Sequence, residues 1–248
     1  MSFRCRALVL GLAFVASTHA EEMRVCAEPD NLPYSHQNET GFENRIARLL
    51  ADELKATLAY TWFLQRRAFV RKTAGLCEVF IGVPSDFEPL LTTRPYYRSS
   101  YVFVGPLESF QDPRLKTLRI GVQLIGDDLA ATPGGHALAM GGAIDNVTGF
   151  PVYGHHPAAQ RIVEAIAQGK LDAAVVWGPA AGHFAFSRKL AVQEAKAPPG
   201  FPLPLQFSIS VGVRRGNGAL REALDAAIER RRLEIHAVLD EYHVPRLP

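Results

Sequence analysis

The chain has 248 residues, of which 27 are Lys or Arg and 25 are Asp or Glu, so its formal net charge is only +2. Nothing in this charge balance indicates nucleic acid or an anionic membrane surface as a partner. The length and the lack of low-complexity segments, heptads or short repeats leave one α/β domain or two small lobes.

The first twenty residues have the layout of a secretory signal peptide. A basic start, Met1–Arg6, is followed by an apolar run, Ala7–Ser17, and by small residues at Thr18–Ala20. The apolar run is too short to span a bilayer. Loss of this segment removes two of the 27 basic residues and leaves 25 against 25 acidic ones. We therefore expect a soluble protein with no membrane anchor that is exported to an oxidising compartment.

Two cysteines remain after the predicted signal peptide, and each begins a short apolar strand. Cys26 belongs to the stretch 24–34 and Cys77 to the stretch 77–84. In an oxidising compartment an even pair favours a disulfide, here one that joins neighbouring strands. Closing a loop of this length would stabilise the fold by roughly 4 kcal/mol. The alternative is two inert buried thiols.

The first elements in chain order predict a strand, a helix and a parallel strand. Thr40 and Glu43 suggest a capping box, and apolar residues recur at helical spacing over 41–55. The β-rich stretch 58–63 follows directly, so a right-handed parallel crossover is expected. A short helix over 66–74 then leads to the Cys77 strand, which brings the cysteines to the same end of a sheet.

A second α/β series begins after an extended stretch at 101–106. It comprises a strand at 118–123, a helix that starts near Pro157 and a buried strand at 171–177. The proline-rich segment 197–204 cannot be a central strand and is interpreted as the return crossing. A strand at 206–214, a helix capped by Asn217 and a final helix around 235–242 complete the chain.

This order predicts two α/β lobes joined by two connecting strands, the first lobe formed by 21–104 and 205–248 and the second by 105–204. A cleft between lobes is where ligands usually bind.

Several motifs in the same order resemble the type II periplasmic solute-binding proteins of the amino-acid-binding superfamily. They lie at 31–34 with 41–43, at 92–101, at 169–176 and at 210–221. A narrower resemblance is to the MoxJ/XoxJ-type, quinoprotein-dehydrogenase-associated solute-binding proteins. It rests on the stretches 26–34, 41–44, 60–62, 65–67, 82–84, 91–97 and 126–139.

The resemblance implies a non-catalytic periplasmic accessory protein that binds, activates or helps to mature a pyrroloquinoline-quinone-dependent (PQQ) methanol or alcohol dehydrogenase, with that enzyme's cytochrome c as a further partner. A second hypothesis is a substrate-binding protein that delivers a small polar or aromatic solute to an ABC permease. A third, an enzyme on this scaffold, would need a buried acid or base in the cleft, and Glu28, Asp30 and Asp86 are the candidates.

Amino-acid binders of this superfamily usually hold the carboxylate with an arginine and the ammonium with an aspartate. Here the arginine position falls near Asp86 and the aspartate position at Trp177 or Gly178. An unpaired buried charge is costly, so these replacements argue against an ordinary α-amino acid as ligand.

Nine residues are candidates for the cleft or for partner contacts. The aromatic ones can stack on a ligand or grip a partner segment, and the arginines can meet an acidic surface, although a buried strand position or a solvated face is the simpler explanation for several. They are Tyr34, Glu43, Arg66, Arg67, Asp86, Arg94, Tyr96, Tyr97 and Trp177.

Other site types lack their motifs. The glycine-rich stretch 126–142 is too irregular for one helix and has no phosphate-loop spacing, so it is interpreted as a flap or a structural loop. His155 and His156 have no metal-site spacing, and no Gly-x-Ser-x-Gly elbow is present. We therefore expect no metal, cofactor or catalytic nucleophile.

Overall fold

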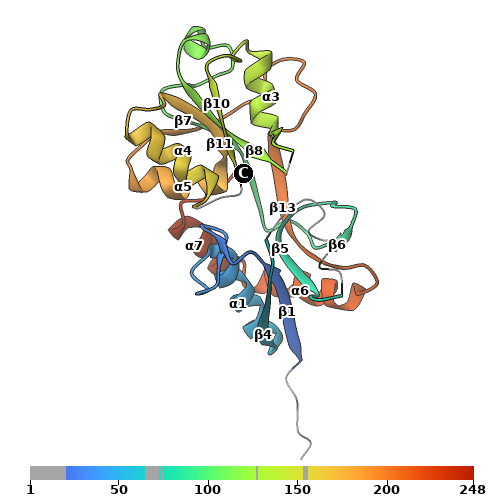
Figure 1. Ribbon diagram of the computed structural model, residues 1–248. Coiled ribbons are helices and arrows are strands. Elements are labelled where there is room, and N and C mark those ends of the chain that lie inside the picture. Colours follow the sequence, from blue (N-terminus) through green and yellow to red (C-terminus); the bar gives the residue numbers. More distant parts are fainter. Residues whose placement is uncertain (1–20, 65–72, 74, 127, 153–155) are drawn as a thin grey trace, which may run out of the picture.

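The computed structural model describes residues 21–64, 73, 75–126, 128–152 and 156–248. Over these ranges the chain forms a large mixed sheet with helices packed on it, arranged as two lobes (Figure 1). The predicted signal peptide, residues 1–20, lies outside the described residues.

The lower lobe in Figure 1 contains a parallel β4-β1-β5 arrangement flanked by helices. Its strands are β1 (Glu22–Ala27), β4 (Thr57–Trp62), β5 (Val79–Pro84) and β6 (Leu90–Thr92), with a small β2 (Asp30–Asn31) and β3 (Ser35–His36) pair. Its helices are α1 (Phe42–Leu54), α6 (Gly218–Arg230) and α7 (Arg232–Glu241).

The upper lobe repeats this scheme with a parallel β10-β8-β11 arrangement. Its strands are β8 (Ile120–Ile125), β9 (Ala130–Ala131), β10 (Val147–Pro151), β11 (Ala173–Trp177) and β12 (Val192–Glu194). Its helices are the 3₁₀ turn η1 (Pro113–Lys116), α3 (Pro133–Met140), α4 (Ala158–Ala167) and α5 (Gly178–Ser187).

Two long strands, β7 (Tyr97–Val104) and β13 (Gln206–Arg214), connect the lobes. They pair antiparallel through their first halves, with Gln206 opposite Ser100 and Ile209 opposite Tyr97. The second half of β7 then pairs with β11, whereas the second half of β13 pairs with β5. Each strand therefore runs from the junction into a different lobe, which confirms the predicted two-lobe fold with two connecting strands. The residue boundaries of the lobes stay a prediction.

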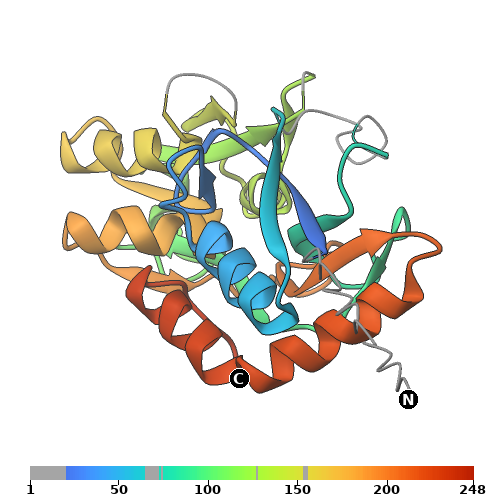
Figure 2. The same cartoon turned by 90° about the horizontal axis from the view of Figure 1, so that it is seen from below.

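Helix α1 shows why this sequence folds as predicted after β1. Phe42, Ile46 and Leu50 recur on one face and are fully buried, and each contributes roughly 1.5–3 kcal/mol by leaving water. The helix packs on α6 and α7, which run along one side of it (Figure 2). Strand β1 precedes this helix in the chain and β4 follows it, and the two strands are parallel, as the crossover rule predicts.

The predicted capping box of Thr40 and Glu43 is wrong. The helix begins at Phe42, so Gly41 is the N-cap, and Asn44 rather than Glu43 closes the box. The Asn44 Oδ1 atom accepts hydrogen bonds from the backbone N–H of Gly41 at 3.1 Å and of His36 at 2.9 Å. Because Asn44 caps the helix, the Glu43 side chain is not used for capping.

The predicted disulfide is present between Cys26 and Cys77, whose Cα atoms are 5.6 Å apart. Both cysteines are buried in a small apolar cluster with Phe80 and Leu90. Strands β1 and β5 are parallel neighbours, so the bridge joins adjacent segments. The prediction that each cysteine begins its strand is wrong for Cys26, which is the fifth residue of β1, whereas Cys77 lies just before β5. Of the helix expected over 66–74, only Thr73 lies within the described residues.

The expectation of an irregular segment over 126–142 is wrong for its central part. Thr132 caps α3 by accepting from the Gly135 N–H, and Pro133 occupies the first turn. Ala137 and Leu138 are fully buried, and Gly134 packs so closely on β11 that a Cβ there would lie 2.6 Å from Val175 Cγ1. The segment therefore contributes a packed helix to the second lobe rather than a flap alone.

Among the helices of the described ranges, none combines the length and the apolar character that crossing a membrane requires.

Candidate functional site

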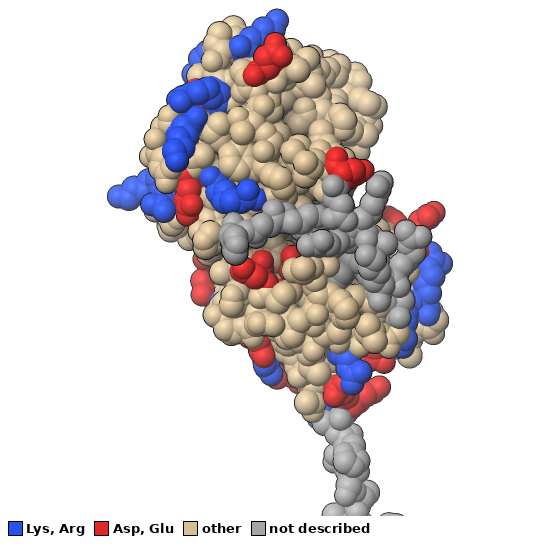
Figure 3. Space-filling model, in the orientation of Figure 1, with Lys and Arg blue, Asp and Glu red and all other residues tan. Residues whose placement is uncertain are grey.

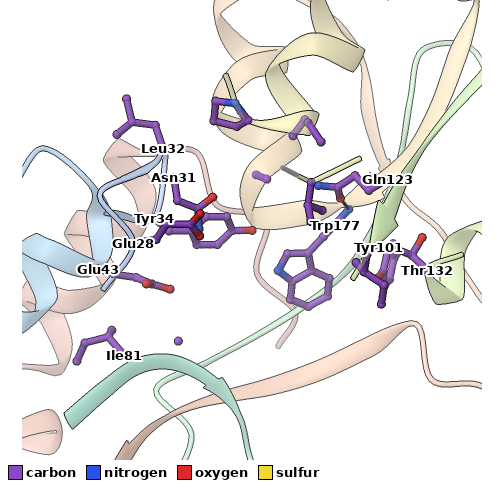
Figure 4. Close-up of a pocket in the computed structure, with 17 residues that line it drawn as sticks. Glu28, Asn31, Leu32, Tyr34, Glu43, Ile81, Tyr101, Gln123, Thr132 and Trp177 are labelled. Carbon is purple, nitrogen blue, oxygen red and sulfur yellow. Dashed lines mark hydrogen bonds between the residues drawn. The ribbon is translucent and has the colours of Figure 1, made fainter. Parts of the chain in front are cut away.

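A cavity of about 370 Å³ lies between the two lobes, beside the connecting strand β7 (Figure 4). This size is within the range of small-molecule sites. The first lobe contributes Glu28, Asn31, Leu32, Tyr34, Glu43, Ile81 and Gly82. The junction and the second lobe contribute Tyr101, Gln123, Ile125, Thr132, Val152, Pro157, Ala158, Ala159, Trp177 and Ala180.

The first turn of α1 fixes the position of Tyr34. The Tyr34 carbonyl accepts the N–H of Glu43 at 2.9 Å, and its ring packs on Phe42 with centroids 5.2 Å apart. Gly41 permits this approach because a Cβ at that position would overlap the Tyr34 carbonyl. Burial raises the pKa of the Tyr34 hydroxyl well above its usual value, with Tyr97 and Glu43 adding to the effect. Tyr34 therefore presents a neutral hydroxyl, which points toward Trp177 in Figure 4.

Glu43 projects into the cavity from the first turn of α1. Its carboxyl group lies on Gly82 of β5, where an added Cβ would come 2.8 Å from Glu43 Cδ, and Gly82 has a φ of +77°. Burial, with a contribution from the charge of Glu28, raises the pKa of Glu43 to about 8. A carboxyl group in this position is mostly protonated at neutral pH unless a cation stabilises its charged form.

Trp177 forms the opposite wall, at the junction of β11 and α5. Its indole makes edge contacts with Tyr101 and Phe207, each with ring centroids 5.5 Å apart. Its backbone N–H donates to Gln123 Oε1 at 3.2 Å. Burial raises the pKa of Tyr101 to about 12, while a hydrogen bond with Thr132 opposes that shift. These contacts hold the indole in one orientation at the cavity surface.

The ionisable side chains among the described cavity residues are two glutamates and two tyrosines, and none of these residues is Lys, Arg or His. On the face shown in Figure 3, basic side chains gather along one edge of the upper lobe, with acidic ones interspersed. The described residues contain no group of three or more His, Cys, Asp or Glu side chains that could hold a metal ion. The described walls thus offer negative charge and aromatic surface but no counter-ion for a carboxylate.

The structure brings three of the predicted site residues together in this cavity, namely Tyr34, Glu43 and Trp177. Tyr96 and Tyr97 lie in the core of the first lobe, with ring centroids 5.0 Å apart. Burial raises the pKa of both well above the usual value, and Glu43 contributes to each shift, so both hydroxyls lie within its electrostatic reach.

Asp86 and Arg94 lie elsewhere, at the surface beside β6. Both are exposed and border a separate hollow that includes Phe207 and Arg221. The Arg94 N–H donates to Asp225 Oδ1 at 2.7 Å, which ties that loop to α6. Arg66 and Arg67 lie outside the described residues.

Sequence reasoning did not place Asn31, Tyr101, Gln123 or Thr132 at the site, and it named Glu28 only as a possible catalytic group. Glu28 directly follows β1, and the carboxyl ends of parallel strands are common ligand positions. The sequence therefore contained a signal that could have placed Glu28 at the site. Tyr101 lies opposite Trp177 across β7 and β11, a register that the sequence does not reveal.

Known proteins with similar sequences and structures cover almost the whole chain. Protein MoxJ of Paracoccus denitrificans is 31% identical over 98% of this chain and 95% of its own length. Protein MoxJ of Methylorubrum extorquens is 32% identical over 95% of this chain and 85% of its own length. No protein-family profile matches the chain.

Solved structures show the same fold. The periplasmic binding protein XoxJ from Methylobacterium extorquens AM1 is 35% identical, with a TM-score of 0.76 over 91% of this chain and 99% of that one. MxaJ from Methlophaga aminisulfidivorans is 26% identical, with a TM-score of 0.78 over 91% of this chain and 100% of that one. An ancestral cationic amino-acid solute-binding protein, 15% identical with a TM-score of 0.69 over 90% and 95%, shares the fold alone. From its sequence and its two-lobe fold, the chain belongs to the MoxJ family of proteins that resemble periplasmic solute-binding proteins.

Proposed function

We propose that this protein is a non-catalytic periplasmic accessory factor that binds a PQQ-dependent alcohol dehydrogenase and activates it or helps it to mature. Membership of the MoxJ family supports the association with such dehydrogenases. The likeness to XoxJ, a periplasmic binding protein, supports the location. We propose that residues 1–20 direct the export.

The observation that carries the proposal is the charge pattern of the cavity between the lobes. An importer of α-amino acids must neutralise both a carboxylate and an ammonium group, and the described lining residues include no basic side chain for the first. Trp177 instead presents a fixed aromatic surface next to Tyr34. Such anchors commonly dominate binding to a protein partner.

The substitution Trp177→Ala tests whether the cavity mouth contacts the dehydrogenase. If the indole is a central contact, activation of the purified dehydrogenase should need roughly tenfold or more additional protein, because central aromatic contacts often contribute about 2 kcal/mol or more. The dose–activity curve of the dehydrogenase, titrated with the mature protein, measures the effect.

Trp62→Ala is the matched control, since Trp62 stacks on Tyr60 of the same strand and is not a cavity residue. It should leave activation unchanged. Equal dose–activity curves for Trp177→Ala and the unsubstituted protein, with both folded, would remove the indole from the contact surface.

Capture of tagged protein from its own host, growing on an alcohol, identifies the partner directly. Recovery of a quinoprotein dehydrogenase or its cytochrome c by mass spectrometry is the expected result. Recovery of an ABC permease, or of a tightly held small molecule without the dehydrogenase, would favour solute transport.

The cavity itself favours a second candidate function, a substrate-binding protein for a small solute and an ABC permease. A volume of about 370 Å³ can enclose a small molecule. Transport would require a solute that binds the closed arrangement of the lobes more tightly than the open one. A decrease in the radius of gyration with solute, measured by X-ray scattering, distinguishes this function.

A further inference from the structure

The cavity contains a carboxyl group that is enclosed by protein and has no hydrogen-bond partner for its side chain among the described residues. The Glu43 carboxyl group lies against Gly82 of β5, and Glu43 contributes to the raised pKa of the Tyr34, Tyr96 and Tyr97 hydroxyls. Its backbone N–H is used by the Tyr34 carbonyl, whereas its carboxyl group faces the open volume (Figure 4). An enclosed carboxylate that lacks a partner is unfavourable, so a positively charged ligand would find a ready counter-ion here.

Aromatic surface lies across the cavity from this carboxyl group. Trp177, held by Tyr101 and Phe207, faces the side from which Tyr34 and Glu43 project. Indole and phenol rings attract cations that approach within about 6 Å of the ring centre. A carboxylate combined with aromatic walls is suited to an ammonium group that carries apolar substituents.

The remaining described walls select against other ligand classes. Ile81, Leu32, Ala158 and Ala159 supply apolar surface for a short alkyl chain. No basic side chain among the described cavity residues can pair with a carboxylate or a phosphate, and the carboxyl groups of Glu28 and Glu43 would repel an acidic ligand wherever they are ionised.

We propose that the interlobe cavity is a binding site for a small alkylammonium ion that carries no carboxylate, with Glu43 as its counter-ion and Trp177 and Tyr34 as its aromatic walls. The site takes up the cation with loss of a proton from Glu43: the carboxylic O–H bond breaks, the proton passes to solvent and the carboxylate pairs with the ammonium. Binding by the isolated protein needs no dehydrogenase, so failure of the partner capture would leave this site intact.

Calorimetric titration of the mature protein with n-butylammonium, butanol and butyrate tests the ligand class. These probes have similar chains and differ in charge. Butylammonium should bind at least about tenfold more tightly than either of the others, because only it pairs with Glu43. Equal affinity for the three, tighter binding of butyrate, or no butylammonium binding up to about 10 mM would overturn the proposal.

Substitutions of Glu43 and Trp177 test whether the ligand binds between these two side chains. Glu43→Gln should abolish the preference for butylammonium over butanol, and Glu43→Asp should retain part of it. Trp177→Phe should weaken binding less than Trp177→Ala, for which a loss of about three- to thirtyfold is expected. Glu222→Gln, an exposed carboxylate on α6 with 74% of its side chain accessible, is the control and should bind like the unsubstituted protein. An unchanged preference in folded Glu43→Gln would contradict the assignment.

The pH dependence provides a readout that a merely structural Glu43 would not give. The groups around it that titrate are Glu28 and the hydroxyls of Tyr34, Tyr96 and Tyr97, and the tyrosine pKa values lie well above neutral. Because the pKa of Glu43 is about 8, binding near pH 7 should release up to about one proton, and affinity should rise with pH until Glu43 is ionised. Butylammonium itself stays protonated below a pH of about 9. A heat of binding that does not vary with buffer ionisation enthalpy would count against the proton release.

The same ammonium group could also come from a lysine side chain of a protein partner. A capped lysine, Nα-acetyl-lysine methylamide, serves as the probe for that source. Binding of butylammonium with equal or greater affinity supports the small-molecule site, whereas binding of the capped lysine alone contradicts it.

Discussion

At the scale of single residues, Gly82 determines where the Glu43 carboxyl group can lie. Its φ of +77° disfavours any side chain, and the space of a Cβ is occupied by the Glu43 carboxyl group. Gly82→Ala should therefore combine a backbone cost of about 1 kcal/mol with a further steric cost of about 1–3 kcal/mol. Urea unfolding measures the sum.

Gly169 offers a matched control, since its φ is +68° but a Cβ there would meet nothing within 4 Å. Gly169→Ala should show the backbone cost alone. Adding Glu43→Ala to Gly82→Ala should recover the steric part, because the obstructing carboxyl group is gone. A similar loss for the two single glycine variants would show that the carboxyl group moves aside freely.

At the scale of elements, the start of α1 depends on one buried amide. Asn44 is 2% exposed, and its Oδ1 atom accepts from two backbone N–H groups, those of Gly41 and His36. Asn44→Leu keeps the branched shape of the side chain but leaves both donors unsatisfied, so the unfolding free energy should fall by about 1–3 kcal/mol. Asn44→Asp retains the acceptor and should lose less in the same urea experiment. Equal losses would mean that volume or charge, rather than the acceptor, determines the effect.

The elements that could be predicted from sequence are those with strong local patterns. The spacing of Phe42, Ile46 and Leu50 predicted α1 within a residue at each end, and the alternation over 206–214 predicted β13. The first turn of α1 was assigned to Glu43 because the pattern of a capping box does not say which of two neighbouring residues occupies the third position. Helix α3 was missed because two glycines outweighed the start signal of Thr132 and Pro133.

The site was less predictable, because its walls come from strands whose register is set by tertiary pairing. Tyr34 and Trp177 were placed by resemblance to solute-binding proteins, and the structure brings both to the cavity. Tyr101 and Gln123 reach it only because β7 and β8 flank β11, an order that no local pattern encodes. The functional roles of these residues stay predictions.

At the scale of the whole molecule, the two lobes also meet away from the connecting strands, through α5 and the end of α7. The His183 ring of α5 stacks on Tyr242 with centroids 5.4 Å apart, and Arg45 of α1 lies over the Tyr242 ring. The Tyr242 hydroxyl donates to the Thr40 carbonyl. The pKa of His183 is lowered, mainly by burial and to a smaller extent by the charge of the neighbouring His243.

This contact makes stability depend on pH. With a folded pKa below the unfolded value of about 6.5, His183 binds fewer protons in the native state. Its contribution is therefore complete above a pH of about 6.5 and is lost as the pH falls toward the lowered folded pKa. Unfolding free energies at several pH values should decline in this window, and His183→Phe should reduce the decline.

The exposed His136 on α3 is the control position for this measurement. His136→Gln shows what the removal of a histidine on the surface does to the same profile. A His183→Phe profile parallel to that of the unsubstituted protein would assign the decline to other groups.

The placement of β13 also constrains the order in which the molecule can be completed during synthesis. Strands β8, β10, β11 and β12 and their partner β7 all lie between residues 97 and 194, so the second lobe has its strands before the last fifty residues emerge. Strand β5 pairs with β1 on one side but needs β13 on the other, and the face of α1 that packs on α6 and α7 stays uncovered until the carboxyl-terminal end is made. A ribosome or translocon that stalls before residue 206 would therefore release a chain with one lobe able to form and the other left as an open sheet edge, a substrate for proteases and chaperones.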